Sequence, residues 1–189
     1  MTTRIRTVAM LGNHLPRQCG IATFTSDLSD AIAVEVPELD CFVLAMNDGG
    51  RHHAYPARVR FEIAESDVAS YQRAADFLNV NAVDVVCVQH EYGIFGGKAG
   101  RHVLETLREL RMPIVTTLHT ILREPTPGQR GAMDEITRLS ERLVVMSAHG
   151  AVLLRDVYGV SEDKIDLIPH GIPSVPFGPR NKDQLVPWT

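Results

Sequence analysis

Short apolar runs alternate with segments of helical periodicity along most of the chain. The apolar runs predict β-strands at Arg6–Leu11, Asp40–Asn47, Val59–Ile63, Val83–His90, Pro113–His119, Arg142–Ser147 and Ile165–Gly171. Several are almost continuously apolar, which is typical of strands buried on both faces of a sheet. The alternation predicts an α/β fold: a Rossmann-like open, mainly parallel sheet of about seven strands with helices on both faces. We expect the strand order 3-2-1-4-5-6-7, with a switch beside the first strand.

Between the strands, apolar residues recur at the spacing of one helical face. These segments are Ile21–Ile32, Val68–Leu78, Val103–Leu110, Met133–Leu139 and Leu153–Val157. For the last helix, Ser147 is the expected N-cap and Gly159 the expected C-terminal stop. Only the residues after Ile172 turn proline-rich and lose periodicity, so we expect an extended or loose segment there.

Composition narrows the partners of this chain. Its 189 residues carry a net charge of −4 without a strongly basic run, which disfavours nucleic acid as a partner. There is no signal-peptide pattern, and no segment approaches about 18 unbroken apolar residues, so we expect no transmembrane segment. The three cysteines are odd in number and widely spaced. This pattern favours reduced thiols in a cytoplasmic protein over a disulfide framework or a thiolate metal site.

Polar residues collect where the expected strands end. In an open parallel sheet, ligands bind beyond the carboxyl ends of the strands. Four of the eight histidines, His14, His90, His119 and His170, fall at such ends. One histidine there is commonly a satisfied polar group, but four on one edge favour a polar ligand site. We expect the following residues to share one rim: His14, Asp48, His90, Glu91 and His119.

Glycines stand at the expected starts of two helices. Gly20 is placed where the first helix begins, and Gly93, Gly96 and Gly97 precede the helix around Val103. Such glycines let backbone N–H groups approach a phosphate or a crowded polyol, although tight turns between strand and helix need glycine as well. The first loop does not fit G-x-G-x-x-G and no segment fits the P-loop pattern, so dinucleotide and P-loop sites are disfavoured.

The sequence contains the residue types for a zinc site and for a cysteine nucleophile, but its pattern favours neither. His90, Glu91, His119 and His170 could ligate zinc, but no H-E-x-x-H or similar spacing supports a metal site. Cys19 could act as a nucleophile with His14 or His119, but packing of the loop explains this cysteine equally well. We therefore expect no metal.

An ordered set of five segments resembles a known family. The segments are RQCGIATFTSDL, VQHEYGIFGG, TTLHTILREPTPGQR, VVMSAHGAVLL and DKIDLIPHGIP. Together they resemble the N-terminal, acceptor-side domain of retaining glycosyltransferases of family 4, which have the GT-B fold. The similarity runs from about Thr7 to Phe177 and includes the P-x-x-C-G-I-A-T-F pattern of a bacterial mannosyltransferase-like branch. It implies a domain over residues 1–177 followed by a loose tail over 178–189.

The resemblance implies roles for individual residues. The loop that opens the first helix would approach the diphosphate of a nucleotide sugar through Arg17, Cys19, Gly20 and Ile21. His119 would lie beside the transferred sugar as the catalytic residue. Most relatives have asparagine in place of His170. The acceptor pocket would be lined by His90, Glu91, Tyr92, Gly96, Gly97 and Thr120.

The resemblance also implies the reaction and its partners. The GT-B fold has two Rossmann-like domains, and the second carries most of the nucleotide-sugar site. We therefore expect an acceptor-side domain that is inactive or weakly active without a separate C-terminal donor domain. The expected partners are a nucleotide sugar, which is a co-substrate and not a cofactor, and a carbohydrate or glycolipid acceptor. The alternative is a stand-alone carbohydrate- or nucleotide-binding regulatory domain that has lost catalysis.

Overall fold

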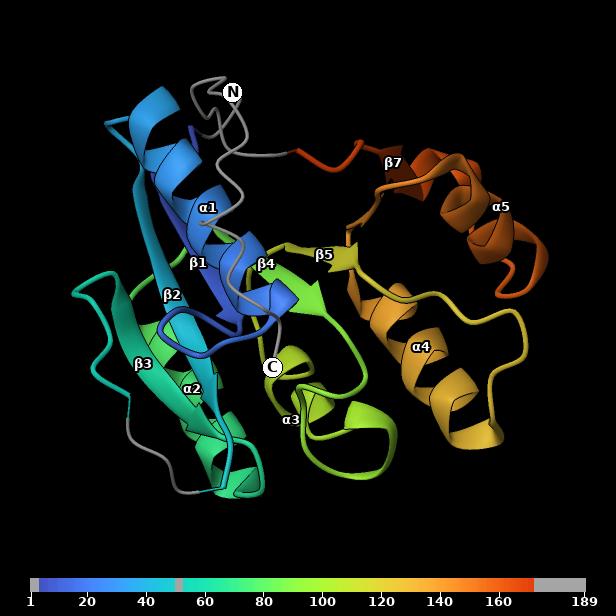
Figure 1. Ribbon diagram of the computed structural model, residues 1–189, viewed down its shortest axis with the longest axis horizontal. Coiled ribbons are helices and arrows are strands. Elements are labelled where there is room, and N and C mark those ends of the chain that lie inside the picture. Colours follow the sequence, from blue (N-terminus) through green and yellow to red (C-terminus); the bar gives the residue numbers. More distant parts are fainter. Residues whose placement is uncertain (1–3, 50–52, 172–189) are drawn as a thin grey trace, which may run out of the picture.

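A single parallel sheet organises the chain in the computed structural model, which describes residues 4–49 and 53–171 (Figure 1). Its seven strands have the order β3-β2-β1-β4-β5-β6-β7, as expected, and every neighbouring pair is parallel. The carboxyl ends of all strands therefore lie along one edge. The strands are β1 Thr7–Gly12, β2 Asp40–Asn47, β3 Val59–Ala64, β4 Val85–His90, β5 Ile114–Leu118, β6 Arg142–Val145 and β7 Ile165–Leu167.

Helices connect the strands, and all of the described α-helices except α3 begin at a side-chain cap. They are α1 Gly20–Glu35, α2 Val68–Val80, α3 Val103–Leu107, α4 Pro127–Leu139 and α5 Ala148–Asp156, with short 3₁₀ turns at Lys98–Gly100 and Glu162–Lys164. Thr126 and Gln129 form a capping box at the start of α4. The expected cap of α5 is confirmed, because the Ser147 hydroxyl accepts from Gly150 N. Gly159 has a left-handed backbone after α5, as its expected role as a helix stop requires.

The two faces of the sheet are covered by different helices. On β1, Met10 belongs to a small cluster that packs against Leu28 and Ile32 of α1. The next residue, Leu11, points to the opposite face and joins the main core with α2 and α3. A third cluster fills the space between β5, β6, α4 and α5. Helix α1 thus covers the opposite face of the sheet from α2 and α3 (Figure 1).

The seventh strand is shorter than the expected Ile165–Gly171. It ends at Leu167, and Ile168 N makes the last hydrogen bond, to Val145 O. Because β6 ends at Val145, residues 169–171 have no strand beside them to pair with. His170 is therefore three residues beyond the strand end. The expected loose tail and the domain boundary at residue 177 lie outside the described residues.

The loop after β4 is fastened to the start of α2. Tyr71 donates its hydroxyl hydrogen to Glu65 O at 3.1 Å and accepts from Gly96 N at 2.9 Å. A Cβ atom at Gly96 would overlap the Glu65 carbonyl oxygen. Gly97 has φ +78° and packs against the ring of His102. Packing thus accounts for both glycines.

We predict that Gly96→Ala destabilises the domain by about 2–3 kcal/mol, because the added methyl group overpacks a site enclosed by backbone. Gly93→Ala in the same loop is the matched control, since a Cβ there meets no atom of the described residues within 4 Å. Urea unfolding followed by circular dichroism measures both changes. Equal midpoints for the two variants would contradict the packing at Gly96.

Candidate functional site at the carboxyl edge of the sheet

The loop between β1 and α1 ends at Cys19, whose thiol caps the N-terminus of α1. Cys19 Sγ accepts from Ala22 N at 3.4 Å and from Asn13 Nδ2 at 3.2 Å. Helix α1 begins at Gly20, as expected, and a Cβ there would meet nothing within 4 Å. Ile21 is half-buried against the main core. Among residues 4–49 and 53–171, nothing fills the space beside Gly20 in the first turn of α1.

Arg17 has partners within the chain. Its Nη1 donates to Met46 O at 3.3 Å, and its Nη2 lies 3.4 Å from an oxygen of Asp48. These contacts tie the β1–α1 loop to the end of β2. The positive charge expected for phosphate binding is thus already balanced by Asp48.

His119 follows β5 at the carboxyl edge and is held from three sides. Its backbone N donates to His90 O at 3.0 Å. Its Nε2 lies 3.0 Å from Oε1 of Gln89, a fully buried residue of β4. The ring meets Phe24 of α1 edge to face, with 4.9 Å between the ring centroids. Phe24 also contacts the ring of His170, at 5.2 Å. Helix α1 and the segment after β7 are thereby brought to the same histidine.

Burial keeps His119 uncharged at neutral pH. It lowers the pKa of His119 to about 4, Glu91 opposes this effect, and His170 adds to it. Glu91 also accepts a hydrogen bond from the Thr120 hydroxyl. A neutral imidazole offers one donor and one acceptor, which suits hydroxyl groups.

His90 lies beside His119 in the sheet but points elsewhere. It is fully buried, with its ring stacked on Phe95 and edge-on to Tyr92. Neither ring nitrogen has a partner among the described residues, and burial lowers the pKa of His90 to about 4. Tyr92 is also buried, packs near Leu118, and has a raised pKa. The substrate-binding roles expected for His90, Tyr92, Gly96 and Gly97 stay predictions, because packing explains their positions.

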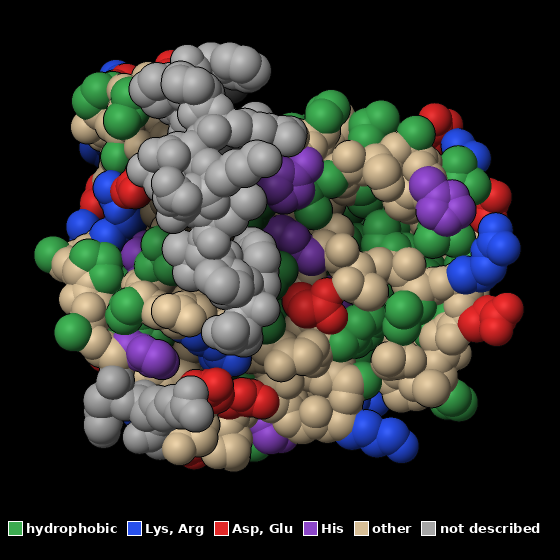
Figure 2. Space-filling view, in the orientation of Figure 1, with side chains coloured by type: hydrophobic (Ala, Val, Ile, Leu, Met, Phe, Trp, Pro, Cys, Tyr) green, Lys and Arg blue, Asp and Glu red, His purple; other side chains and the backbone are tan. Residues whose placement is uncertain are grey.

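Another expected rim residue, His14, lies two residues beyond the end of β1. Its side chain is buried near Tyr55, and its Nδ1 lies 2.7 Å from Leu15 O. Histidine and acidic side chains meet in the centre of the face drawn in Figure 2. Among the described residues, no three histidine, cysteine or acidic side chains come together as metal ligands.

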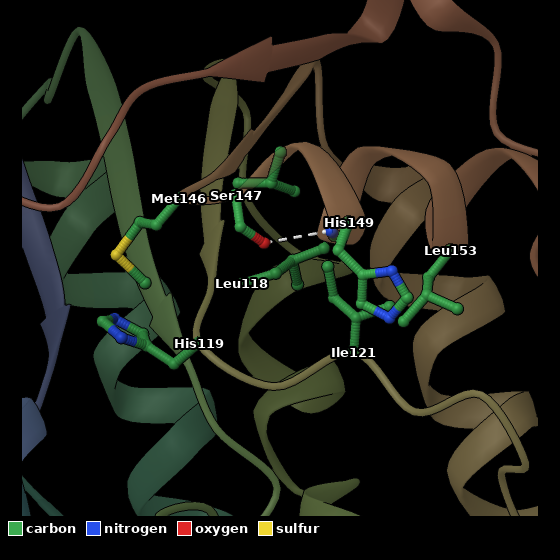
Figure 3. Close-up of a pocket in the computed structure, with 9 residues that line it drawn as sticks. Leu118, His119, Ile121, Met146, Ser147, His149 and Leu153 are labelled. Atoms are coloured by element: carbon green, nitrogen blue, oxygen red, sulfur yellow. Dashed lines mark hydrogen bonds between the residues drawn. The ribbon is translucent and has the colours of Figure 1, made fainter.

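A pocket of about 150 Å³ opens beside His119, at the start of α5. In Figure 3, His119 and Met146 lie on one side of it and His149 and Leu153 on the other. Among the described residues, the lining contains no Lys, Arg, Asp or Glu. The lining residues are Leu118, His119, Ile121, Val145, Met146, Ser147, His149, Gly150 and Leu153.

Sequence reasoning missed several residues of this site. Gln89 could have been singled out from the sequence, because an amide side chain at the end of an apolar strand needs a hydrogen-bond partner when it is buried. His149 follows the expected cap at Ser147 and could have been placed at the start of α5. Phe24 was assigned to a helical face, but its contact with His119 depends on how α1 crosses the sheet.

Comparison with known proteins adds independent findings. The sequence model of the family described as Glycosyltransferase Family 4 matches residues 6–174. The crystal structure of a glycosyltransferase from Rickettsia africae ESF-5 is similar, with a TM-score of 0.59 and 14% sequence identity. The similarity covers 90% of this chain and 44% of that one. No curated protein sequence matches the chain. Within residues 4–49 and 53–171, no helix has both the length and the apolar character needed to cross a membrane.

The buried histidines predict that stability falls in mild acid. The pKa of His90 is about 4 in the folded chain and near 6.5 in the unfolded chain, so the unfolded chain binds more protons between these values. The free energy of unfolding should therefore drop as the pH falls from 7 to 4, with His90 contributing on the order of 3 kcal/mol.

Urea unfolding at several pH values measures this slope. His90→Leu should flatten it by about half, because His119 shares the same direction of pKa shift. An unchanged slope in the variant would show that His90 is not the group responsible.

Proposed function

Because the chain belongs to glycosyltransferase family 4, we propose that it forms the acceptor-side half of a nucleotide-sugar-dependent retaining glycosyltransferase. The observation that carries the proposal is the position of His119. Its neutral ring lies at the carboxyl edge of the sheet, lines the pocket, and contacts the first turns of α1 through Phe24. A sugar held there would meet an imidazole that can exchange hydrogen bonds with its hydroxyl groups.

The pocket suits one ring of a carbohydrate or glycolipid acceptor. His119, Ser147 and His149 supply polar atoms, while leucine and isoleucine side chains offer an apolar surface to the C–H face of a sugar. Glu91 and Thr120, which hydrogen-bond to each other close to His119, would line the same side of the acceptor.

The start of α1 would take the donor diphosphate. Gly20 leaves room for close approach of an anion, and the helix N-terminus favours negative charge between Cys19 and Ile21. Arg17, however, is already paired with Asp48, so little positive charge remains for a diphosphate. We infer that a separate donor-binding domain supplies the rest of the site. The chain spans 44% of the length of the similar glycosyltransferase, which is compatible with such a division.

Transfer requires donor and acceptor in one water-excluded cleft. We therefore propose that these 189 residues alone transfer sugar weakly or not at all. The test compares nucleotide-sugar hydrolysis and transfer by this chain with those of a version joined to a donor-binding domain. Robust turnover by the chain alone would contradict the proposal that a separate donor-binding domain is required. Sugar binding without transfer by either protein would instead support a regulatory binding domain.

In the two-domain enzyme, His119→Ala should lower kcat by about 100-fold or more, the effect expected for removing one positioned polar group. The melting temperature should fall as well, because the buried Gln89 loses its hydrogen-bond partner, so kcat is compared at a temperature at which both proteins are fully folded. Val80→Ser, at the 83% exposed end of α2, is the control and should retain full activity. Unchanged kcat in His119→Ala would remove the basis of the proposal.

A further inference from the structure

We propose that Gln89 is a positioning residue that holds His119 in the tautomer with the proton on Nε2, which leaves Nδ1 as a hydrogen-bond acceptor. The two side chains approach within 3.0 Å, from Gln89 Oε1 to His119 Nε2. A carbonyl oxygen only accepts, so the imidazole nitrogen facing it must donate. A neutral histidine carries one ring proton, and Nδ1 is then free to accept.

The surroundings leave the imidazole little freedom to turn. The backbone N–H of His119 is bonded to His90 O, which fixes the end of β5 against β4. Phe24 lies against the ring with an interplanar angle of 86°. Nδ1 makes no hydrogen bond to the described residues and is not among the buried polar atoms that lack a partner. It is therefore the ring nitrogen left for a ligand.

Gln89 occupies a place that the fold keeps open for it. It is fully buried near the end of β4, and Gly12 of β1 lies directly beside it. A Cβ on Gly12 would approach Gln89 Cβ to 2.9 Å, closer than packed side chains allow. A buried amide is unfavourable unless it is hydrogen-bonded. The Gln89 oxygen is bonded to His119, whereas the Gln89 Nε2 has no partner among the described residues. The site thus depends on a pair of side chains from neighbouring strands.

The choice of an amide at position 89 keeps the imidazole uncharged. A carboxylate of the same shape would favour the imidazolium form, whereas an amide oxygen orients the ring without stabilising a positive charge. An acceptor at Nδ1 selects a ligand that donates, such as a hydroxyl group. This last step rests on the proposed function, but the tautomer itself does not.

Nitrogen NMR of the ¹⁵N-histidine-labelled 189-residue chain distinguishes the two tautomers directly. The expected spectrum shows His119 protonated at Nε2 and neutral at pH 7. Gln89→Leu removes the acceptor and should give a mixture of tautomers. Gln89→Glu keeps the shape and should convert His119 to imidazolium at pH 7. The opposite amide orientation, in which Gln89 donates, would place the proton on Nδ1 in the parent chain. That result would overturn the proposal, as would an unchanged tautomer in Gln89→Leu.

Activity of the two-domain enzyme separates this inference from the proposed function. Gln89→Leu should lower kcat by roughly 10-fold or more with a smaller change in KM, because the imidazole loses its orientation. If the tautomer shifts while His119→Ala leaves turnover intact, the positioning stands and the proposed function fails. If Gln89→Leu does not fold, Gln89→Asn retains an amide too short to reach His119 and should also release the tautomer. A fixed Nε2–H tautomer in Gln89→Asn would overturn the proposal.

Discussion

The parallel pairing of β1 with β4 is the constraint from which the site follows. At this junction the chain changes direction across the sheet, so α1 leaves on one face while α2 and α3 cover the other. In open parallel sheets, ligands bind beyond the strand ends at such a change of direction. Gly12 and Gln89 meet across the same junction, where the absence of one side chain makes room for the other. The contact between Gly12 of β1 and Gln89 of β4 thus belongs both to the packing of the sheet and to the hydrogen bonding of His119.

Burial decides the electrostatic character of the rim more than formal charge does. Of the charged groups near His119, Glu91 is engaged by Thr120, and Arg17 at the neighbouring loop is engaged by Asp48. The pocket lining itself offers a ligand hydrogen-bonding groups but, among the described residues, no Lys, Arg, Asp or Glu. Such groups discriminate by direction, since a hydrogen bond fails when donor faces donor. A pocket without these side chains agrees with a polyhydroxylated ligand better than with a highly charged one.

The sequence predicted the sheet because its signals are local. Apolar runs such as that of β2 have the length and continuity of a strand covered on both faces, and the order of the strands follows from the handedness of the crossovers. The rim was harder to predict. His90 and His119 both stand at strand ends, yet side chains alternate between the faces of a strand, and the pairing register decides which residues meet. That register sets Gln89, and not His90, against the ring of His119. The shortened β7 also depends on where its neighbour ends.

The lining of the pocket at the start of α5 determines how strongly ligand binding there depends on ionic strength. Its lining carries polar atoms but, within the described part of the chain, no Lys, Arg, Asp or Glu. Dissolved ions weaken attraction between charges over about a Debye length, and they leave neutral hydrogen bonds almost untouched. Occupation of this pocket by an uncharged sugar should therefore vary little with ionic strength. Binding of a diphosphate at a helix N-terminus would weaken as salt is added, so the proposed donor and acceptor would differ in how strongly their binding depends on ionic strength.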